Sequence, residues 1–202
     1  KVTDAEGNTK TYTPGAPTGK SDGSRTMYGN GNHNLSIGDV DGDGCDEVVW
    51  GAAALDNDGK LLYSTGFGHG DAMHLADHNP DRPGLELFHI HEGSPYGWDL
   101  HDAGTGAILF KASGSSDNGR GIAAQLSSTD RGSYFSSSND KQQRSAVTGK
   151  IASNSTTSMN FRIFWDGDLQ EELFDGGKID NWNGTSTTRI YINGKNPYDY
   201  NA

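Results

Sequence analysis

Asp39-Val-Asp-Gly-Asp-Gly-Cys-Asp-Glu-Val-Val-Trp50 is the stretch that decides the fold. Carboxylates stand at alternate positions, Gly44 permits a sharp bend, and an apolar strand follows at once. Ca²⁺ takes about six to eight oxygen ligands, which such a loop can supply, whereas an EF-hand would need a helix on either side. The stretch therefore predicts a calcium turn between two strands, and a solvated acidic loop is the alternative. The expected ligands are Asp39, Asp41, Asp43, the Cys45 carbonyl and Glu47.

The composition argues against a protein of long helices. Only 32% of the 202 residues are hydrophobic, and 29 residues are glycine. Short apolar runs alternate with Gly, Asp, Asn and Ser, whereas helices need a sustained helical period of apolar positions. We therefore expect an all-β chain with a lean core.

The charge and the cysteine content limit the partners. The formal net charge is −11, and clustered Asp residues supply much of it, which argues against nucleic acid and favours divalent cations. One cysteine excludes an internal disulfide framework, so metal ions would have to stabilise the protein outside the cytoplasm. No apolar run approaches the length of a membrane span, so we expect no membrane partner. The chain opens on Lys1 without a signal-peptide pattern, and we expect a mature or excised segment.

Four segments of the chain share one plan. Each begins with a short strand, continues through a polar turn and adds further strands; the first strands fall near residues 33–39, 71–77, 119–125 and 161–165. Four-stranded repeats of roughly 40 to 50 residues are typical of β-propeller blades. The sequence predicts about four consecutive blades, a partial propeller domain, in residues 31–202. A loop-rich lead-in with room for one strand would occupy residues 1–30, and residues 136–158 would form a long surface loop.

The second and third repeats vary the acidic turn. Asp77-His-Asn-Pro-Asp-Arg-Pro-Gly-Leu-Glu86 keeps oxygen ligands at alternate positions and a closing acid, with one extra residue. We expect a second calcium turn there, and a turn without metal is the alternative; its ligands would be Asp77, Asn79, Asp81 and Glu86. The third turn, Gln125 to Ser133, has lost nearly all its carboxylates, and we expect no metal in it.

A second group of polar residues falls at the heads of the first strands. His33 and Asp71 occupy equivalent places in their repeats, and His69 and Arg120 lie close to the same point. Neighbouring blades would present these side chains to one face of the domain. Glu92 can join them only if the chain bends back after its strand. The alternative is that these groups only satisfy strand ends.

Successive motifs of the chain resemble those of the rhamnogalacturonan lyases of polysaccharide lyase family 11. The matches keep their order from about residue 28 to residue 182, and the combination is specific although no single motif is. They are Gly31–Gly44, Tyr63–His74, Pro80–Glu86, His91-Glu92, Gly119–Gly121 and Asn160–Asp168. Asn183-Gly-Thr185 spells another motif of that family, but its place between two strands indicates a hairpin turn.

The resemblance implies an eight-bladed, calcium-rich propeller, of which this chain would cover about half. It implies cleavage of the rhamnogalacturonan I backbone of pectin by β-elimination, with several calcium ions as cofactors. Removal of the C5 proton of a galacturonate would be assisted by a cation on its carboxylate. The family's metal ligands match His33, His69, Asp71 and Glu92. Arg120 and His74 are the expected substrate-binding residues, with Arg120 as a carboxylate clamp; the catalytic base stays unidentified.

Three further expectations follow from this resemblance. The enzyme would be secreted or exposed at the cell surface, where pectic polysaccharide is its partner. The open blade faces of a partial ring invite self-association. The rival function is a non-catalytic, calcium-stabilised propeller module that binds glycan or protein.

Overall fold

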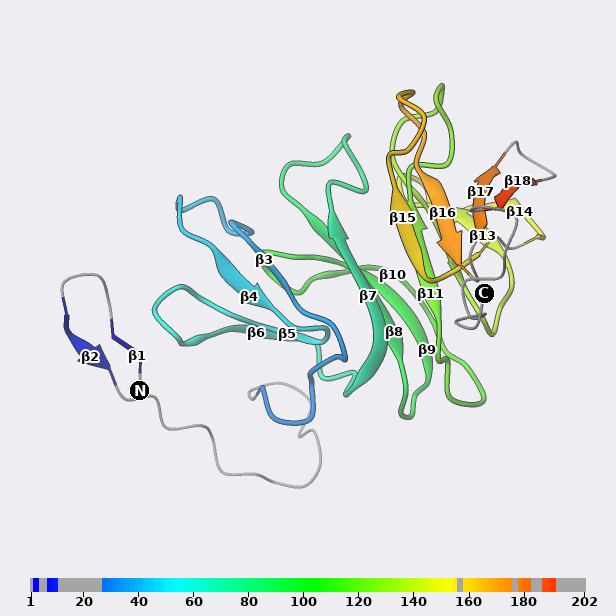
Figure 1. The fold of residues 1–202 in the computed structure, drawn as a ribbon. Coiled ribbons are helices and arrows are strands. Elements are labelled where there is room, and N and C mark those ends of the chain that lie inside the picture. The colour runs from blue at the N-terminus through cyan, green and yellow to red at the C-terminus, as the bar shows by residue number, and fades with distance from the viewer. Residues whose placement is uncertain are drawn as a thin grey trace, which may run out of the picture.

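The computed structural model describes residues 2–3, 7–10, 27–155, 158–175, 178–182 and 187–191. Within these residues the chain forms only strands and turns, so the all-β prediction is confirmed. Four antiparallel four-stranded sheets follow one another along the chain (Figure 1). No helix in the described part is long and apolar enough to cross a membrane.

Each sheet is a simple up-and-down meander of four consecutive strands. Sheet I contains β3 (Ser36–Gly38), β4 (Glu47–Val49), β5 (Ala53–Leu55) and β6 (Leu61–Ser64). Sheet II contains β7 (Gly70–Ala76), β8 (Glu86–His91), β9 (Gly97–Asp102) and β10 (Ile108–Ala112). Sheet III contains β11 (Gly121–Ala124), β12 (Tyr134–Ser137), β13 (Gln143–Ser145) and β14 (Ile151–Ser153). Sheet IV contains β15 (Phe161–Ile163), β16 (Glu172–Asp175), β17 (Lys178–Trp182) and β18 (Thr187–Tyr191).

The same register recurs where the first two strands of each sheet meet. Gly38 pairs with Glu47, Ala76 with Glu86, Ala124 with Tyr134 and Ile163 with Glu172. In every sheet the last residue of the first strand therefore faces the first residue of the second. The polar turn between these strands starts and ends at equivalent places, so the closing positions of the four turns can be compared directly.

The first strands also connect neighbouring sheets. Asn32, just before sheet I, forms a parallel bridge with Gly70 of β7. The Nε2 atom of His74 on β7 lies 3.2 Å from the Gly121 carbonyl oxygen of β11, and Arg162 on β15 donates to the Leu75 carbonyl oxygen at 3.4 Å. The sheets are thus joined at their first strands, where residues far apart in sequence meet.

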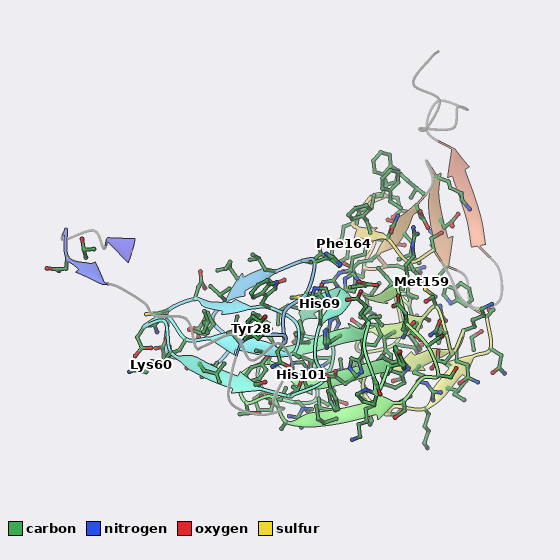
Figure 2. All side chains as sticks on the ribbon, turned by 90° about the horizontal axis from the view of Figure 1, so that it is seen from below. Tyr28, Lys60, His69, His101, Met159 and Phe164 are labelled. Carbon is green, nitrogen blue, oxygen red and sulfur yellow. The ribbon has the colours of Figure 1, made fainter. Side chains whose placement is uncertain are left out.

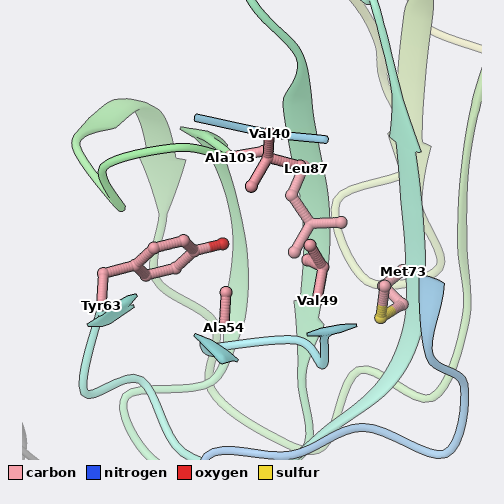
Figure 3. Packing of buried hydrophobic residues seen from close by; sticks show 7 residues of the cluster. All are labelled: Val40, Val49, Ala54, Tyr63, Met73, Leu87 and Ala103. Atoms are coloured by element: carbon pink, nitrogen blue, oxygen red, sulfur yellow. The ribbon is translucent and has the colours of Figure 1, made fainter. Parts of the chain in front are cut away.

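The core lies between the sheets, in three clusters. Sheets I and II bury Val40, Val49, Ala54, Tyr63, Met73, Leu87 and Ala103 between them (Figure 3). Sheets II and III bury Phe88, Ile90, Trp98, Leu100, Ala123, Phe135 and Ala146, and sheets III and IV bury Ile122, Ala124, Leu126, Leu173 and Trp182. Full burial of one Leu or Phe side chain contributes about 1.5–3 kcal/mol. Each sheet therefore depends on its neighbour for a stable face.

Apolar side chains remain exposed on the first and last sheets of the row. Leu35 and Ile37 are 58% and 55% exposed at sheet I, and Phe161, Phe164, Trp165 and Leu169 are 57% to 74% exposed at sheet IV. Figure 2 shows Phe164 projecting from the outside of the row. Large side chains of this kind pack well only against a further element.

The predicted long loop over residues 136–158 is wrong. The structure places the end of β12 and all of β13 and β14 in that stretch. Its serines, asparagines and charged residues carry little apolar alternation, but the backbone groups of β13 and β14 pair with neighbouring strands. Ala146 directly after β13 is fully buried. Outer strands with one solvent-exposed face show weak apolar alternation in the sequence, because pairing with neighbouring strands supplies their stability.

Two other predictions concern the ends of the chain. The lead-in contains the short hairpin of β1 (Val2–Thr3) and β2 (Thr9–Lys10), where at most one strand was expected. The remainder of the lead-in before residue 27 lies outside the described residues, as does the predicted turn Asn183–Thr185. The strands on either side of that turn, β17 and β18, pair antiparallel.

Candidate functional site

Two histidines and two acids meet on the surface where sheets I and II join. The ligand atoms of His33, His69, Asp71 and Glu92 all lie within 4.8 Å of one another, and we name this group the surface cluster. His33 Nε2 is 3.3 Å from Asp71 Oδ1, and His69 Nδ1 is 2.6 Å from Glu92 Oε2. The two imidazoles meet edge to face, with ring centroids 4.8 Å apart. Side chains from both sheets thus build one group.

Backbone hydrogen bonds hold the surface cluster in place. The amide of His33 donates to the Gly70 carbonyl at 3.2 Å, and the amide of Gly70 donates to the Gly31 carbonyl at 3.1 Å. The amide of Glu92 donates to the His69 carbonyl at 3.0 Å, which continues the pairing of β7 and β8 by one residue. Glu92 therefore reaches the cluster without any reversal of the chain. This resolves the condition that the sequence had set for it.

The electrostatics of the surface cluster suit a cation. Burial raises the pKa of the Asp71 carboxyl, and the negative charge of Glu92 raises this pKa further. A divalent ion between the two acids would offset both effects. Carboxylate oxygens are ligands that Ca²⁺ accepts, and imidazoles add nitrogen donors. The exposure of His33 and Glu92 leaves room for water or a substrate as further ligands.

Arg120 and His74 lie on different sides of the same region. Arg120 directly precedes β11 and is more than half exposed, with Nη1 3.6 Å from Asp175 Oδ2. The neighbouring Gly119 lies against Asp71, because a Cβ there would sit 3.5 Å from Asp71 Oδ2. His74 is partly buried between sheets, and burial, aided by Arg162, lowers its pKa to about 4. Arg120 is therefore available to a ligand beside the cluster, whereas the contact of His74 with Gly121 is one between sheets.

A second group of histidines lies buried in sheet II. The carboxylate of Asp99 contacts His91 Nε2 at 2.6 Å, His89 Nδ1 at 3.4 Å and His101 Nδ1 at 2.5 Å, and we name these four residues the buried cluster. All four are at most 2% exposed. His101 Nε2 is 3.0 Å from the Tyr63 hydroxyl, whose pKa is raised chiefly by burial. The sequence analysis had named His91 only as part of a family motif and had not selected the other three residues.

Charge balance explains how this buried carboxylate persists. Burial by itself would raise the pKa of Asp99, but the histidines, His101 foremost, hold that pKa well below its ordinary value. Burial lowers the pKa of His89, and its hydrogen bond to Asp99 opposes this. The carboxylate thus stays ionised because several imidazole groups surround it.

The two clusters touch across one glycine. Gly70 sits between His69 and Asp71 in the chain, and a Cβ there would overlap the Ile90 carbonyl oxygen and the His89 ring nitrogen Nε2. Only a residue without a side chain lets β7 pass so close to β8. The buried cluster therefore lies directly behind the backbone that carries two members of the surface cluster.

The acidic turn of sheet I is ordered by its own carboxylates. Asp39 accepts the amides of Gly42 at 2.8 Å and Gly44 at 3.1 Å, and both glycines have φ in the left-handed region, at +83° and +91°. The ligand atoms of Asp39, Asp41 and Asp43 lie within 4.8 Å of one another. A second such group joins Asp41 and Glu47 to Asp56, which the sequence analysis did not select. It belongs to the hairpin between β5 and β6.

The closing glutamate shows how the turn of sheet I fits a cation. Glu47 is fully buried; its Oε2 accepts the amide of Val40 at 2.9 Å, and its Oε1 has no hydrogen-bond partner among the described residues. A buried carboxylate oxygen without a partner is costly unless an ion or water contacts it. Asp41 links the two groups, because its ligand atom lies within 4.8 Å of those of Asp39 and Asp43 and also of those of Glu47 and Asp56. The donor set therefore fits Ca²⁺.

The turn of sheet IV repeats this arrangement, and the sequence analysis assigned no metal to it. Asp166, Asp168 and Glu172 form a group with ligand atoms within 4.8 Å, and Gly167 has φ +92°. Glu172 Oε2 accepts the amide of Trp165 at 2.9 Å, while its buried Oε1 has no partner. The spacing Asp-Gly-Asp followed by Glu is identical in Asp41–Glu47 and Asp166–Glu172. That shared spacing is the signal that could have found this turn.

The turn of sheet II departs from this pattern. Glu86 Oε2 accepts the amide of Asn79 at 2.9 Å, but Arg82 Nε stands 3.6 Å from Glu86 Oε1. Within the described residues, Asp77 and Asp81 do not join Glu86 in a group of acids within 4.8 Å. Glu86 Oε1, like Glu47 Oε1 and Glu172 Oε1, has no hydrogen-bond partner within the described residues, but the guanidinium of Arg82 places a positive charge beside it.

Sheet III has a tyrosine at the closing position. Tyr134 pairs with Ala124 where the other sheets have glutamate, and its hydroxyl donates to Asp130 Oδ2 at 2.5 Å. Burial and the carboxylate of Asp130 raise the pKa of Tyr134 to about 12. The amide of Gln125 donates instead to Glu171 of sheet IV, at 2.8 Å.

The chain is similar to known pectin-degrading enzymes. It matches the family described as rhamnogalacturonan lyase family 11, C-terminal domain, over residues 16–201. Rhamnogalacturonan endolyase YesW of Bacillus subtilis (strain 168) is 45% identical over 177 residues, and rhamnogalacturonan exolyase YesX of the same organism is 47% identical over 172 residues. These matches cover 85% and 81% of this chain but 28% of each relative. The chain thus spans less than a third of the length of these curated relatives.

Solved structures give the same result. The crystal structure of rhamnogalacturonan lyase YesW aligns with a TM-score of 0.76 at 44% identity, and Bacillus licheniformis rhamnogalacturonan lyase PL11 aligns with a TM-score of 0.76 at 46% identity. Each alignment covers 81% of this chain and 28% of the other.

Proposed function

The chain belongs to rhamnogalacturonan lyase family 11, and on this premise we propose that it is part of an enzyme that cleaves the rhamnogalacturonan I backbone of pectin. The reaction is a calcium-assisted β-elimination at C5 of a galacturonate, which leaves an unsaturated uronate. The observation that carries the proposal is the surface cluster, because sheets I and II contribute both histidines and acids to one exposed point beside Arg120.

The four sheets are consecutive blades of an eight-bladed propeller. Exposed apolar side chains on sheets I and IV support this, because further blades would cover them. Until they are covered, the same side chains favour self-association of the chain. The enzyme is secreted or held at the cell surface, where pectic polysaccharide occurs.

The residues of the surface cluster divide the work of the reaction. His33, His69, Asp71 and Glu92 would hold a calcium ion, which supplies a Lewis acid for the galacturonate carboxylate when bound. Arg120 presents a planar guanidinium to the substrate. This group orients either a second carboxylate of the polysaccharide or the other side of the galacturonate carboxylate that the cation contacts. Asp175 fixes one edge of this guanidinium and leaves more than half of the side chain exposed.

Two other ions are structural. Ca²⁺ binds the turns of sheets I and IV, where Glu47 Oε1 and Glu172 Oε1 lie buried without partners beside two or more aspartates. In sheet II the predicted ligands stay a prediction, and Arg82 competes with a cation there.

The lyase activity is tested on the intact protein that carries this chain. We expect rhamnogalacturonan I and calcium to give a rising ultraviolet absorbance from the unsaturated product, and we expect Arg120→Ala to lower the rate at least tenfold, or about 1.4 kcal/mol. Arg131→Ala is the matched control, because Arg131 is also more than half exposed and pairs with a carboxylate, that of Asp81 at 3.3 Å, away from the cluster. Carbohydrate binding without any unsaturated product would instead establish the non-catalytic module.

The structural ions are tested by chelation. At a calcium concentration of about 100 times Kd, binding to the native state alone adds about 2.7 kcal/mol per site, so a chelator should lower the unfolding temperature. Glu47→Gln should remove part of this calcium dependence. Asp46→Asn should keep it, because Asp46 is an exposed acid of the same turn outside both metal groups. An unfolding temperature that does not depend on calcium would exclude these sites.

A further inference from the structure

A cavity of about 240 Å³ opens between sheets III and IV, at the turn end of β11. Its floor is buried, with Gln143 1%, Gln170 9% and Trp182 8% exposed. Its rim carries the exposed Ser128 and Asp130. Small-molecule pockets begin at about 300 Å³, so this cavity has room for one small ring and not for an oligosaccharide.

The floor of the cavity contains a donor that the protein does not use. Gln143 Nε2 is buried and has no hydrogen-bond partner within the described residues. Gln170, by contrast, is fixed by donation to Asn181 Oδ1 at 3.0 Å and to the Trp182 carbonyl oxygen. Unpaired buried donors are rare, because each loses its bonds to water. A ligand in the cavity would supply the missing acceptor.

The charge of the lining limits what that ligand can be. Among the described residues of the lining, Asp130 alone is charged, and it already accepts the Tyr134 hydroxyl. The same residues include no Lys or Arg, so a carboxylate or phosphate would find no counter-charge among them. One carboxylate is also too few for Ca²⁺, which needs several oxygen ligands. The cavity therefore suits a neutral molecule.

Hydroxyl and aromatic groups complete the lining. Ser127 Oγ accepts the amide of Asp130 at 3.0 Å, which orients this hydroxyl from the backbone side. Tyr134 and Trp182 supply ring surface on the walls. Apolar rings with a few fixed polar groups are the usual composition of a small-molecule site. A neutral sugar ring, with both hydroxyls and C–H faces, matches this combination.

We propose that the cavity between sheets III and IV is a binding site for one neutral monosaccharide unit. It is separate from the surface cluster, because Arg120 and Leu126 lie beyond opposite ends of β11, and six residues of extended chain span roughly 20 Å. The cavity also lies at the turn of sheet III, where Tyr134 stands at the position that glutamate has in the other three sheets. The site does not depend on the lyase reaction, and it can be tested without calcium or turnover.

The test is saturation-transfer NMR on the intact protein in chelator, with galactose, arabinose and rhamnose as neutral probes and galacturonate as the anionic probe. We expect at least one neutral sugar to bind, and we expect Gln143→Leu to leave any binding of galacturonate at Arg120 unchanged. Gln143→Leu should weaken the neutral sugar about tenfold, because it removes the free donor. The unfolding temperature of the Gln143→Leu variant should not fall, because the substitution removes an unpaired donor from the interior. A loss of sugar binding by this variant would therefore not result from unfolding.

Gln142→Leu is the matched control. Gln142 is a neighbouring glutamine outside the cavity lining, and its side chain forms hydrogen bonds with Asn154 and Arg144. The Gln142→Leu variant should bind the neutral sugar as tightly as the unchanged protein does. Absence of binding by all three neutral sugars would overturn the proposal. So would equal binding of the neutral sugars by the Gln143→Leu variant and the unchanged protein.

Discussion

The surface cluster and the buried cluster contain the same kinds of residue and lie on either side of Gly70, yet they differ in what they can do. His33, His69, Asp71 and Glu92 are partly or largely exposed, and their ligand atoms lie within 4.8 Å of one another at the surface. The buried cluster is closed, with every carboxylate oxygen of Asp99 already on a histidine.

The difference shows that burial, more than residue type, decides the role of a His and Asp group. An exposed carboxylate beside a second acid favours a cation and a substrate. A buried carboxylate is stable only with counter-charges beside it, because its desolvation is costly. The paired carboxylate then forms part of the scaffold. In this chain the scaffold stands directly behind the site.

The largest expected effect comes from the centre of the buried cluster. Asp99→Asn removes the charge that balances the histidines and should lower the free energy of unfolding by about 3–5 kcal/mol. Urea unfolding in chelator measures this without any contribution from calcium. Asp46→Asn, on the surface, is the control and should change stability by less than about 0.5 kcal/mol. Equal stability of the two variants would show that the buried cluster is not part of the scaffold.

A smaller effect is expected where the clusters touch. Gly70→Ala forces a methyl group against the Ile90 carbonyl and the His89 ring and should cost about 1–3 kcal/mol. It should also weaken calcium binding, because His69 and Asp71 move with this backbone. Gly119→Ala is the matched control, since its methyl group would meet Asp71 only at an ordinary 3.5 Å. Calorimetric titration of calcium and thermal unfolding should separate the two variants, and indistinguishable results would contradict the coupling.

The surface cluster should behave in the opposite way. Glu92→Gln removes a half-exposed acid and should weaken calcium binding at this site about tenfold, or about 1.4 kcal/mol. Stability in chelator should change by less than about 1 kcal/mol, because exposed pairs contribute little. Calcium titration and unfolding in chelator measure both quantities. A large loss of stability in chelator would place Glu92 in the scaffold instead.

The smallest effect at neutral pH concerns His74, on the same strand as Asp71. Its pKa of about 4 lies below the ordinary histidine value of about 6.5, so the unfolded chain binds this proton more readily. The contribution of neutral His74 to the free energy of unfolding is complete above about pH 6.5. It is lost as the pH falls toward 4, by up to about 1.4 kcal/mol per pH unit. His74→Asn should flatten this slope in urea unfolding at pH 7 and pH 5. An unchanged slope would show that His74 does not titrate in this window.

Much of the fold could be predicted from the sequence. The short apolar runs and the polar turns locate the first strands of all four sheets, near residues 33–39, 71–77, 119–125 and 161–165. The outer strands β13 and β14 were missed, since Gln143 and Arg144 carry no apolar alternation and only pairing with β12 makes them strands. The family resemblance is confirmed by the match over residues 16–201.

The candidate sites divide in the same way. The sequence placed His33, His69 and Asp71 at the heads of adjacent strands and grouped Glu92 with them by resemblance, and the structure brings the four side chains together. Asp56 escaped notice because it comes from a different hairpin than the acids it approaches. The turn of sheet IV escaped notice although Asp166-Gly-Asp168 repeats the spacing of Asp41-Gly-Asp43.

The sequence by itself determined the all-β class, the four repeats and the acidic turns, because these depend on residues that are close together in the chain. Only the tertiary structure decided which carboxylates are left with an unpartnered oxygen, which histidines are exposed, and where a cavity opens. Those properties depend on other strands and sheets, since Asp99 meets His89 and His91 across paired strands, and one cavity is lined by Gln143 of sheet III and Trp182 of sheet IV. Burial and pairing across sheets set the cost of each charge, and a linear pattern does not contain them.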